Sequence, residues 1–306
     1  MDTVGTGSAK LILFGEHAAV HGFPAIGTPL PEETTVRLHG PGRQAWNLEG
    51  VPAPDRGVIE SLMTAMEELL PEVERRCISI SSAVPRGVGF GSSAALCTAL
   101  SSAALGTRSG DVWKLAHQLE RVFHGTPSGV DTGLSFLPGV TAFEPRPPAL
   151  PAWERAPCAP LWLVVGAVPR MDNSAALIRG IGERMRSGES SVREALAGLG
   201  RIAVEARRRL GEQTAATVIA RLADEAQAVL ADLGLSSPSL DALLAEGRSS
   251  GALGGKLSGA GGGGAFFLVC DSQRAAQNVA ARLGRAGETA PLAAAPRALC
   301  IGEPAK

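Results

Sequence analysis

Pro85–Ala95 reads PRGVGFGSSAA, and it combines alternating glycines with the start of a helix. Glycines at positions 87, 89 and 91 let the backbone approach a ligand closely and aim successive N–H groups at it. Ser92 and Ser93 then open a run of small residues typical of a packed helix, whose N-terminus favours an anion. The spacing is neither the dinucleotide-binding GxGxxG nor a P-loop. The segment therefore predicts a phosphate-binding loop of another kind; a glycine-rich turn without a ligand is the alternative.

The upstream segment Lys10–Gly22, KLILFGEHAAVHG, places ionisable side chains at the end of a buried strand. Its first five residues form an apolar run typical of such a strand, and Gly15 ends it. Glu16 and His17 follow at the strand terminus, where functional sites are often built. This order predicts that Lys10 pairs with Glu16 across the turn.

Two carboxylates follow the glycine-rich segment. Glu120 comes late in a predicted helix, and Asp131 ends the segment HGTPSGVD at residues 124–131. The Pro/Gly loop between them is able to fold the second carboxylate back near the first. Two carboxylates beside a phosphate loop suit Mg²⁺ coordination and acceptance of a proton from an alcohol. A solvated helix surface for Glu120 and a simple turn for Asp131 are the alternatives.

A second glycine-rich segment lies late in the chain. Residues 251–264 contain eight glycines in fourteen positions and lead into the apolar run Ala265–Cys270. Dense glycine before a strand indicates backbone packed closely against a ligand or another loop. A flexible linker is the alternative, but linkers seldom lead directly into such a strand.

Apolar periodicity along the rest of the chain predicts mixed α and β structure in two halves. Six prolines between Pro145 and Pro160 mark the junction, which gives domains at residues 1–157 and 158–306. A helix with Asp111 as its N-cap is expected to stop near Gly125. The other expected helices are 58–70, with Val58, Ile59, Leu62, Met63, Met66 and Leu69 on its apolar face, 94–105, three or four within 174–248, and 273–283; the other expected strands are 77–82, 161–168 and 298–301.

Composition excludes several classes of protein. The chain has 306 residues, with 29 basic and 30 acidic side chains and a net charge of −1, which gives no electrostatic footprint for nucleic acid or an acidic membrane. No apolar run approaches the roughly 18–20 residues that span a bilayer, and the first residues do not resemble a signal peptide. Tyrosine is absent, and lysine occurs only four times, so each lysine attracts interest.

A zinc site and a disulfide scaffold are both disfavoured. The five cysteines are scattered and form no CxxC pair, which favours reduced thiols in the cytoplasm. His17 and His21 are four positions apart, as in the zinc motif HExxH, but Ala18 stands where that motif has Glu.

Taken in order, these four segments resemble the motifs of the GHMP kinase superfamily, which includes galactokinase, homoserine kinase, mevalonate kinase and phosphomevalonate kinase. KLILFGEHAAVHG and HGTPSGVD look like the mevalonate kinase forms. The resemblance implies a two-domain α+β fold, with an N-terminal ribosomal-protein-S5-like α/β domain and a C-terminal ferredoxin-like α+β domain. It also implies ATP and Mg²⁺ as cofactors, and members of the superfamily are often homodimers.

The resemblance further implies a role for individual residues. Asp131 would abstract the proton of the substrate hydroxyl, with Lys10 beside that hydroxyl. Ser93 and Glu120 would bind Mg²⁺. The residues implied in substrate binding are Glu16, His17, Ser174, Gly259 and Ala260; those implied in ATP binding are Pro85, Gly87, Val88, Gly89, Phe90, Gly91, Ser92, Ser93 and Ala94.

The substrate that the resemblance implies is mevalonate, phosphorylated on its primary hydroxyl in isoprenoid precursor synthesis. Phosphomevalonate kinase, a mevalonate 3-kinase-like enzyme and a non-catalytic ligand-binding regulator are the alternatives. Two segments depart from the family pattern. Residues 170–174, Arg-Met-Asp-Asn-Ser, replace the usual Arg-(Asn/Ser)-Thr-Lys, and Pro29 and Pro31 are expected to interrupt a strand.

Overall fold

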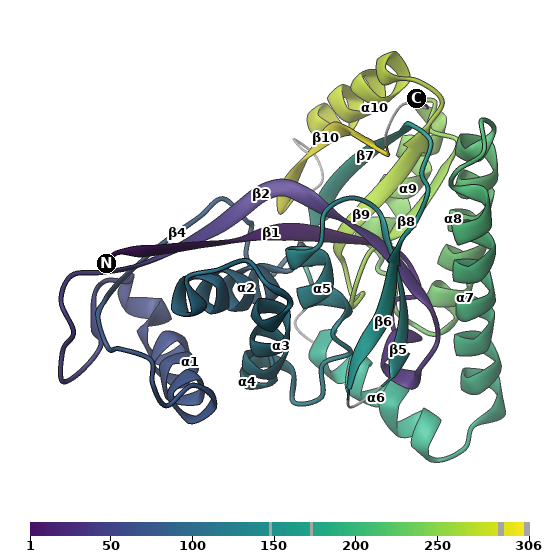
Figure 1. Ribbon diagram of the computed structural model, residues 1–306. Coiled ribbons are helices and arrows are strands. Elements are labelled where there is room, and N and C mark those ends of the chain that lie inside the picture. The colour runs from purple at the N-terminus through teal and green to yellow at the C-terminus, as the bar shows by residue number, and fades with distance from the viewer. Residues whose placement is uncertain (147–148, 172–173, 287–290, 303–306) are drawn as a thin grey trace.

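The computed structural model describes residues 1–146, 149–171, 174–286 and 291–302. Within them the strands form two sheets, shown with their helices in Figure 1. The first sheet contains β1 (Thr3–Phe14), β2 (Ala25–His39), β3 (Asn47–Gly50), β4 (Cys77–Ser82), β5 (Thr141–Arg146) and β6 (Ala149–Arg155). The second contains β7 (Leu161–Val168), β8 (Gly254–Leu257), β9 (Gly264–Cys270) and β10 (Ala294–Ile301). This arrangement confirms the expected α+β class.

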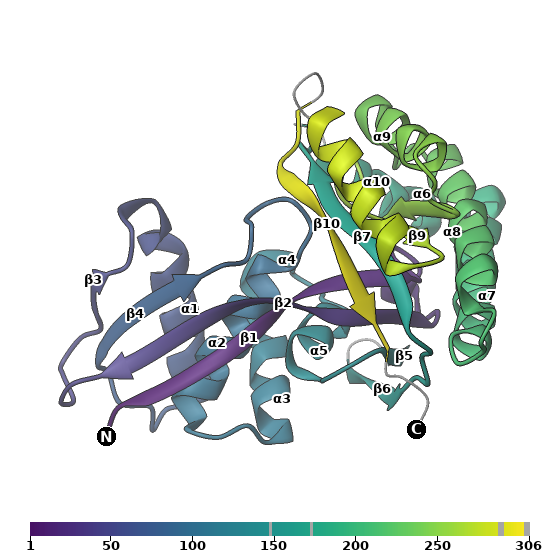
Figure 2. The same cartoon turned by 90° about the horizontal axis from the view of Figure 1, so that it is seen from above.

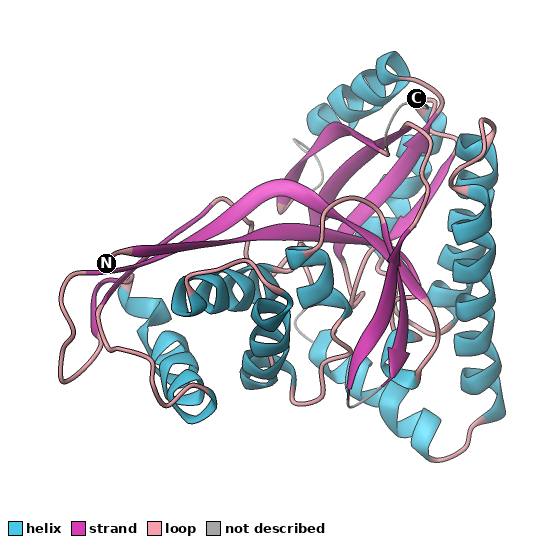
Figure 3. Ribbon diagram, in the orientation of Figure 1, coloured by secondary structure: helices cyan, strands magenta, loops and turns pink. Residues whose placement is uncertain are grey.

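The first sheet has the order β3-β4-β2-β5-β6, with β1 paired to β2. Its helices gather beneath the long β1–β2 pair (Figure 3). The apolar helix α2 packs against β1 and β2, while α3 and α5 pack against α2. The bounds are α1 (Arg56–Leu69), α2 (Ser92–Leu105), α3 (Gly110–Leu119), α4 (Arg121–His124) and α5 (Val130–Phe136).

The second sheet has the antiparallel order β10-β7-β9-β8. Helix α10 lies along β10 and β7, whereas α8 and α9 pack against β8 and β9, as the view in Figure 2 shows. The long helix α7 packs against α8. The bounds are α6 (Ser174–Arg186), α7 (Ser190–Arg209), α8 (Ala215–Asp232), α9 (Pro238–Ser249) and α10 (Gln273–Ala286).

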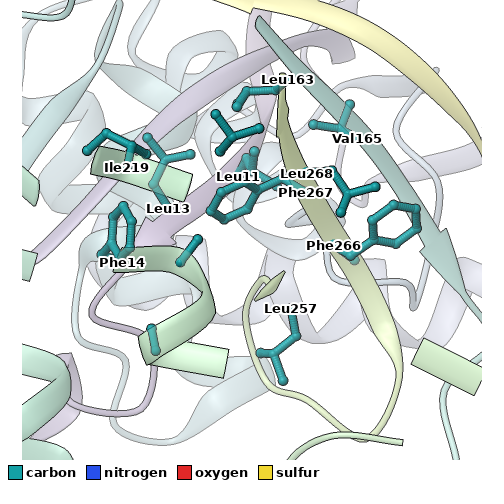
Figure 4. Close-up of a cluster of buried hydrophobic side chains, with 14 of the residues drawn as sticks. Leu11, Leu13, Phe14, Leu163, Val165, Ile219, Leu257, Phe266, Phe267 and Leu268 are labelled. Carbon is teal, nitrogen blue, oxygen red and sulfur yellow. The ribbon is translucent and has the colours of Figure 1, made fainter. Parts of the chain in front are cut away.

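One apolar core joins the two sheets. Leu11, Leu13 and Phe14 of β1 are completely buried and belong to the same cluster as side chains of β7, β9 and α8. Figure 4 shows these β1 side chains facing Leu163 and Phe267. Because β1 is buried between its own helices and the second sheet, its last residues, Leu11–Phe14, form a continuous apolar run.

The strand predicted to be broken by Pro29 and Pro31 is continuous, which corrects that expectation. Strand β5 pairs with residues 25–27 of β2 and β4 with residues 34–39, so in the described structure residues 28–33 have no strand on that edge. Pro31 lies where the β1–β2 register shifts at a bulge. A proline is tolerated at such positions because no ladder hydrogen bond needs its missing N–H.

Three details of the predicted helices were wrong. The N-cap of α3 is Ser109, whose backbone is extended, while Asp111 lies in the helical first turn, where its charge complements the helix dipole. The helical stretch ends before Gly125 as expected, but it is not one helix, because it divides at Glu120 into α3 and α4. Val58 and Leu69 are exposed, because they flank the narrower buried stripe of α1.

The proline-rich segment is more regular than predicted. Most of it forms the antiparallel β5–β6 hairpin, while Pro147 and Pro148 lie outside the described residues. The glycine-rich segment likewise contains an unpredicted strand, β8, which pairs with β9. Glycine has a low strand propensity, so tertiary packing determines the structure there.

Candidate active site

The loop before α2 has the backbone that its glycines predicted. Gly87, Gly89 and Gly91 have φ of 74°, 98° and 76°, in the left-handed region that glycine adopts without strain. A side chain at Gly91 would lie 2.7 Å from Cγ of Lys10. The Lys10 amide donates a hydrogen bond of 2.9 Å to the Phe90 carbonyl. The loop therefore lies directly on β1 at Lys10, and the N-terminus of α2 follows it.

Lys10 forms an ion pair with Asp131. The Lys10 ammonium nitrogen lies 2.8 Å from a carboxylate oxygen of Asp131, and the two side chains are 4% and 35% exposed. Asp131 occupies the first turn of α5, which begins after Gly129 in a left-handed conformation. A carboxylate that is held by a buried cation and still reaches solvent is available to a substrate.

Glu120 lies in a buried position close to Asp131. Burial and the negative charge of Asp131 raise the pKa of Glu120 to about 8. Apart from the nearby Thr132 side chain, neither of its carboxylate oxygens has a hydrogen-bond partner among the described residues. The two carboxylates thus come together as predicted, and the unpartnered oxygens of Glu120 fit a cation. Within the same described part of the chain, no three His, Cys, Asp or Glu side chains form a metal site by themselves.

Ser93, the other predicted metal ligand, lies in the first turn of α2. Its hydroxyl lies 3.4 Å from Nε2 of His124. Burial lowers the pKa of His124 below its ordinary value. A neutral imidazole is therefore the neighbour of Ser93 at neutral pH.

The structure corrects the predicted pairing of Lys10 with Glu16. The carboxylate of Glu16 instead accepts a hydrogen bond from the ammonium of Lys256, a residue of β8. Both side chains are completely buried. Sequence reasoning missed Lys256, although the scarcity of lysine was a signal for it.

His17 contacts the second glycine-rich segment. It has φ of 59°, a left-handed conformation that places its ring toward Ala260. Its Nε2 donates a hydrogen bond of 3.0 Å to the Ala260 carbonyl, and because a carbonyl only accepts, Nε2 must carry a proton. Burial lowers the pKa of His17 to about 4, so the ring is neutral at pH 7 and Nδ1 is an acceptor.

The two glycine-rich loops face each other across Lys10. A side chain at Gly259 would lie 3.8 Å from the Lys10 ammonium nitrogen and 3.8 Å from the Gly89 carbonyl oxygen. The Ser258 hydroxyl fixes this loop to β1, accepting from the Ile12 amide at 3.0 Å and donating to the Ile12 carbonyl at 2.8 Å. Phosphate groups bound by the first loop would therefore lie close to both Lys10 and Asp131.

Arg170 follows β7 and reaches the same place. Its guanidinium lies 3.2 Å from where a side chain at Gly89 would begin. Burial lowers the pKa of Arg170, and its buried Nε has no hydrogen-bond partner in the described structure. Ser174 belongs to the same altered segment, residues 170–174, and begins α6. Its side chain lies outside the described residues, as do Asp172 and Asn173.

Comparison with known proteins identifies the class to which this arrangement belongs. Residues 57–139 match the family model "GHMP kinases N terminal domain", and residues 212–289 match "GHMP kinases C terminal". The chain belongs to the GHMP kinase family.

Within that family the chain resembles mevalonate kinases. It is 30% identical to mevalonate kinase from Homo sapiens over 83% of this chain and 82% of that protein. It is 27% identical to mevalonate kinase from Pyrococcus abyssi over 92% of each. The crystal structure of L. major mevalonate kinase in complex with R-mevalonate has the same fold, with a TM-score of 0.80 at 23% identity, covering 100% of this chain and 97% of that one.

Proposed function

We propose that the chain transfers the terminal phosphoryl group of ATP to the primary hydroxyl of mevalonate. The observation that carries this proposal is the 2.8 Å Lys10–Asp131 ion pair beside two glycine-rich loops. Phosphoryl transfer needs alignment and charge neutralisation more than covalent help from the protein. The buried ammonium of Lys10 beside the partly exposed carboxylate of Asp131 supplies both the alignment and the charge neutralisation at the acceptor hydroxyl.

In this proposal Asp131 accepts the proton of the acceptor hydroxyl. Lys10 contacts the same hydroxyl and the transferring phosphoryl, where its positive charge favours the developing negative charge. Backbone N–H groups from Gly87 to Ser92 bind the ATP phosphates at the N-terminus of α2. The guanidinium of Arg170, close to Gly89, adds a second positive charge at the phosphates.

Ser93 and Glu120 are the residues that would hold Mg²⁺. A hydroxyl and an unpartnered carboxylate fit this hard cation, which keeps water and substrate phosphates as its other ligands. When bound, Mg²⁺ would neutralise charge on the ATP phosphates. It would also compensate the burial that raises the pKa of Glu120 to about 8.

A cavity next to the first loop suits the nucleoside of ATP. It has a volume of about 440 Å³ and opens beside Ser92 and Ser93. Apolar side chains from α1, α2, β4 and the neighbouring loops line it, among them Val51, Ile59, Ile80, Leu96 and Phe123. An apolar pocket with a few polar groups at its edge is typical of small-molecule sites.

We assign His17 and Ala260 to the acceptor side, because Ala260 follows Gly259, which faces the Lys10 ammonium, and its carbonyl accepts the hydrogen bond from His17. The neutral ring of His17 offers Nδ1 to a hydroxyl or water of the bound acid. Glu16 acts on this side through the turn that it shares with His17. The altered segment 170–174 is the place where acceptor specificity would differ from that of relatives, with Ser174 in the usual position of a threonine.

Three further proposals follow from the same assignments. The domain boundary lies at residues 157/158, between the strands of the first sheet and β7. The cysteines are unpaired thiols, which supports a cytoplasmic location. A homodimer is the expected assembly, which light scattering would test.

No helix in the described part of the chain is long and apolar enough to cross a membrane.

The experiment that tests the function is ADP release with MgATP and mevalonate, run beside phosphomevalonate, galactose and homoserine. We expect turnover with mevalonate. Turnover with phosphomevalonate in its place would keep the phosphoryl-transfer chemistry and overturn the acceptor. Absence of turnover with every acceptor, while ATP still binds, would favour the ligand-binding regulator; the presence of both Lys10 and Asp131 argues against that outcome.

A further inference from the structure

Lys256 carries a completely buried ammonium group that the proposed chemistry does not use. Its nitrogen donates to the carboxylate of Glu16 and, at 2.6 Å, to the Leu257 carbonyl. The rings of Phe14 and Phe267 lie 5.9 Å and 5.5 Å from it. Lys256 thus connects the second sheet to the end of β1 through a charge pair that water does not reach.

A gain in the free energy of folding does not explain why this buried charge pair is present. Taking both charges out of water costs more than their attraction returns in many proteins, and apolar pairs of similar volume are often as stable or more so. Burial accordingly raises the pKa of Glu16 and lowers that of Lys256. A role in the neighbouring site accounts for a pair that stability does not require.

The charges beside Glu16 show what this role is. Besides Lys256, the other cation that acts on the Glu16 carboxylate is Lys10, and the imidazoles of His17 and His21 follow in the adjoining segment of the chain. Lys10 is also the partner of Asp131. Charges therefore alternate from Lys256 through Glu16 to Lys10, which also acts on Asp131 and Glu120, so Lys10 lies between Glu16 and the carboxylates of the site.

We propose that Lys256 is a positioning residue: by neutralising Glu16 from β8, it leaves Lys10 free to pair with Asp131 and to act on the phosphoryl group. Without Lys256, the buried carboxylate of Glu16 has Lys10 as its remaining cation. Lys10 would then be drawn away from Asp131, and the reaction would lose its positioned charge while ATP binding stayed intact.

The geometry of the segment supports this assignment. Lys256, Ser258 and Ala260 alternate along one stretch of chain, and each contacts the end of β1 or the turn after it. The three contacts hold Glu16, Ile12 and the ring of His17, respectively. The second glycine-rich segment therefore fixes the C-terminal end of β1, beginning two residues beyond Lys10.

This inference rests on the proposed phosphoryl transfer, and it is tested with three variants of the full chain: K256M, E16Q and K256M/E16Q. Removing one partner of a buried pair leaves an unpaired charge, whereas the double variant leaves none. In K256M we expect kcat to fall by about tenfold or more with KM for ATP unchanged. In the double variant we expect kcat within about threefold of E16Q, because the neutral amide that replaces the Glu16 carboxylate no longer competes for Lys10.

Two results would overturn the proposal. One is wild-type kcat in K256M. The other is a double variant whose kcat lies about tenfold or more below that of E16Q, which would mean that Lys256 acts by another route. The second comparison decides the matter even if K256M does not fold.

A crystal structure of K256M or of the double variant needs no substrate and separates this proposal from the assignment of mevalonate. In K256M, the Lys10 nitrogen should leave its 2.8 Å position beside Asp131 and approach Glu16. In the double variant it should remain beside Asp131. An unmoved Lys10 in K256M would refute the inference whatever the wild type phosphorylates.

Discussion

Replacing Asp131 by Asn tests the core of the proposed mechanism. The amide keeps the shape of the side chain but neither accepts a proton nor balances Lys10. Loss of a positioned general base lowers kcat by about 10²–10⁴-fold. The Lys10 side chain is 4% exposed and would lose its counter-charge, a change that costs about 3–5 kcal/mol in a fully buried pair. Since Asp131 is 35% exposed, solvent screens the pair, and we expect about 1–3 kcal/mol of destabilisation.

The assay is steady-state ADP release with saturating acceptor, together with ATP binding by calorimetry and urea unfolding. The matched control is Asp111→Asn, because Asp111 also lies 2.8 Å from a lysine, Lys114, but both side chains are 68% exposed. The control should change the unfolding free energy by less than about 0.5 kcal/mol and leave kcat unchanged. Retention of kcat within about threefold in Asp131→Asn would refute the role of this carboxylate as the base.

Three other outcomes are expected. Gly91→Ala should lower kcat and lower the free energy of unfolding by about 1–3 kcal/mol, because φ is 76° and the new methyl would lie 2.7 Å from the Lys10 side chain. Gly57→Ala, with open space around it, is the control, and equal effects of the two substitutions would contradict the loop assignment. The free energy of unfolding of the wild type minus that of His17→Asn should rise by up to about 3 kcal/mol between pH 4 and 6.5 and then level off in urea titrations. The unfolded chain binds a proton at His17 that the folded chain, with its pKa of about 4, does not, whereas the opposite contribution of Glu120 is common to both proteins; a difference that does not change with pH would contradict this assignment. Chelation by EDTA should abolish ADP release and added Mg²⁺ should restore it; activity that persists in EDTA would contradict the metal role of Glu120.

Much of the fold followed from local sequence signals. Strands with continuous apolar runs, such as Leu161–Val168, were predicted with their observed bounds. The continuity of β2 could not be predicted, because whether Pro31 breaks a strand depends on which neighbours pair beside it. Strand β8 was missed for the same reason: its glycines favour a loop, and only pairing with β9 makes it a strand.

The site was predictable where one short segment carries the function. Alternating glycines determine the loop before α2 whatever surrounds them, and the approach of Glu120 to Asp131 followed from the loop between them. The partner of Glu16 was beyond local reasoning. Lys10 and Lys256 both carry the required charge, and only the packing of the second sheet against β1 shows which of them binds Glu16.

The apolar core shared by β1, β7 and β9 has a consequence for the catalytic cycle. Opening the molecule by separating the two sheets would expose Leu11, Phe14 and Phe267, which are now completely buried. The free-energy cost is about 25 cal/mol for each Å² of apolar surface that becomes exposed. Residues 259–264 of the second glycine-rich loop, in contrast, carry only the methyl group of Ala260, whereas the first loop keeps Val88 and Phe90 in this core. We therefore expect nucleotides to enter and leave by movement of this second loop around a body that stays closed, so that the rate of product release depends on the backbone freedom of a few glycines.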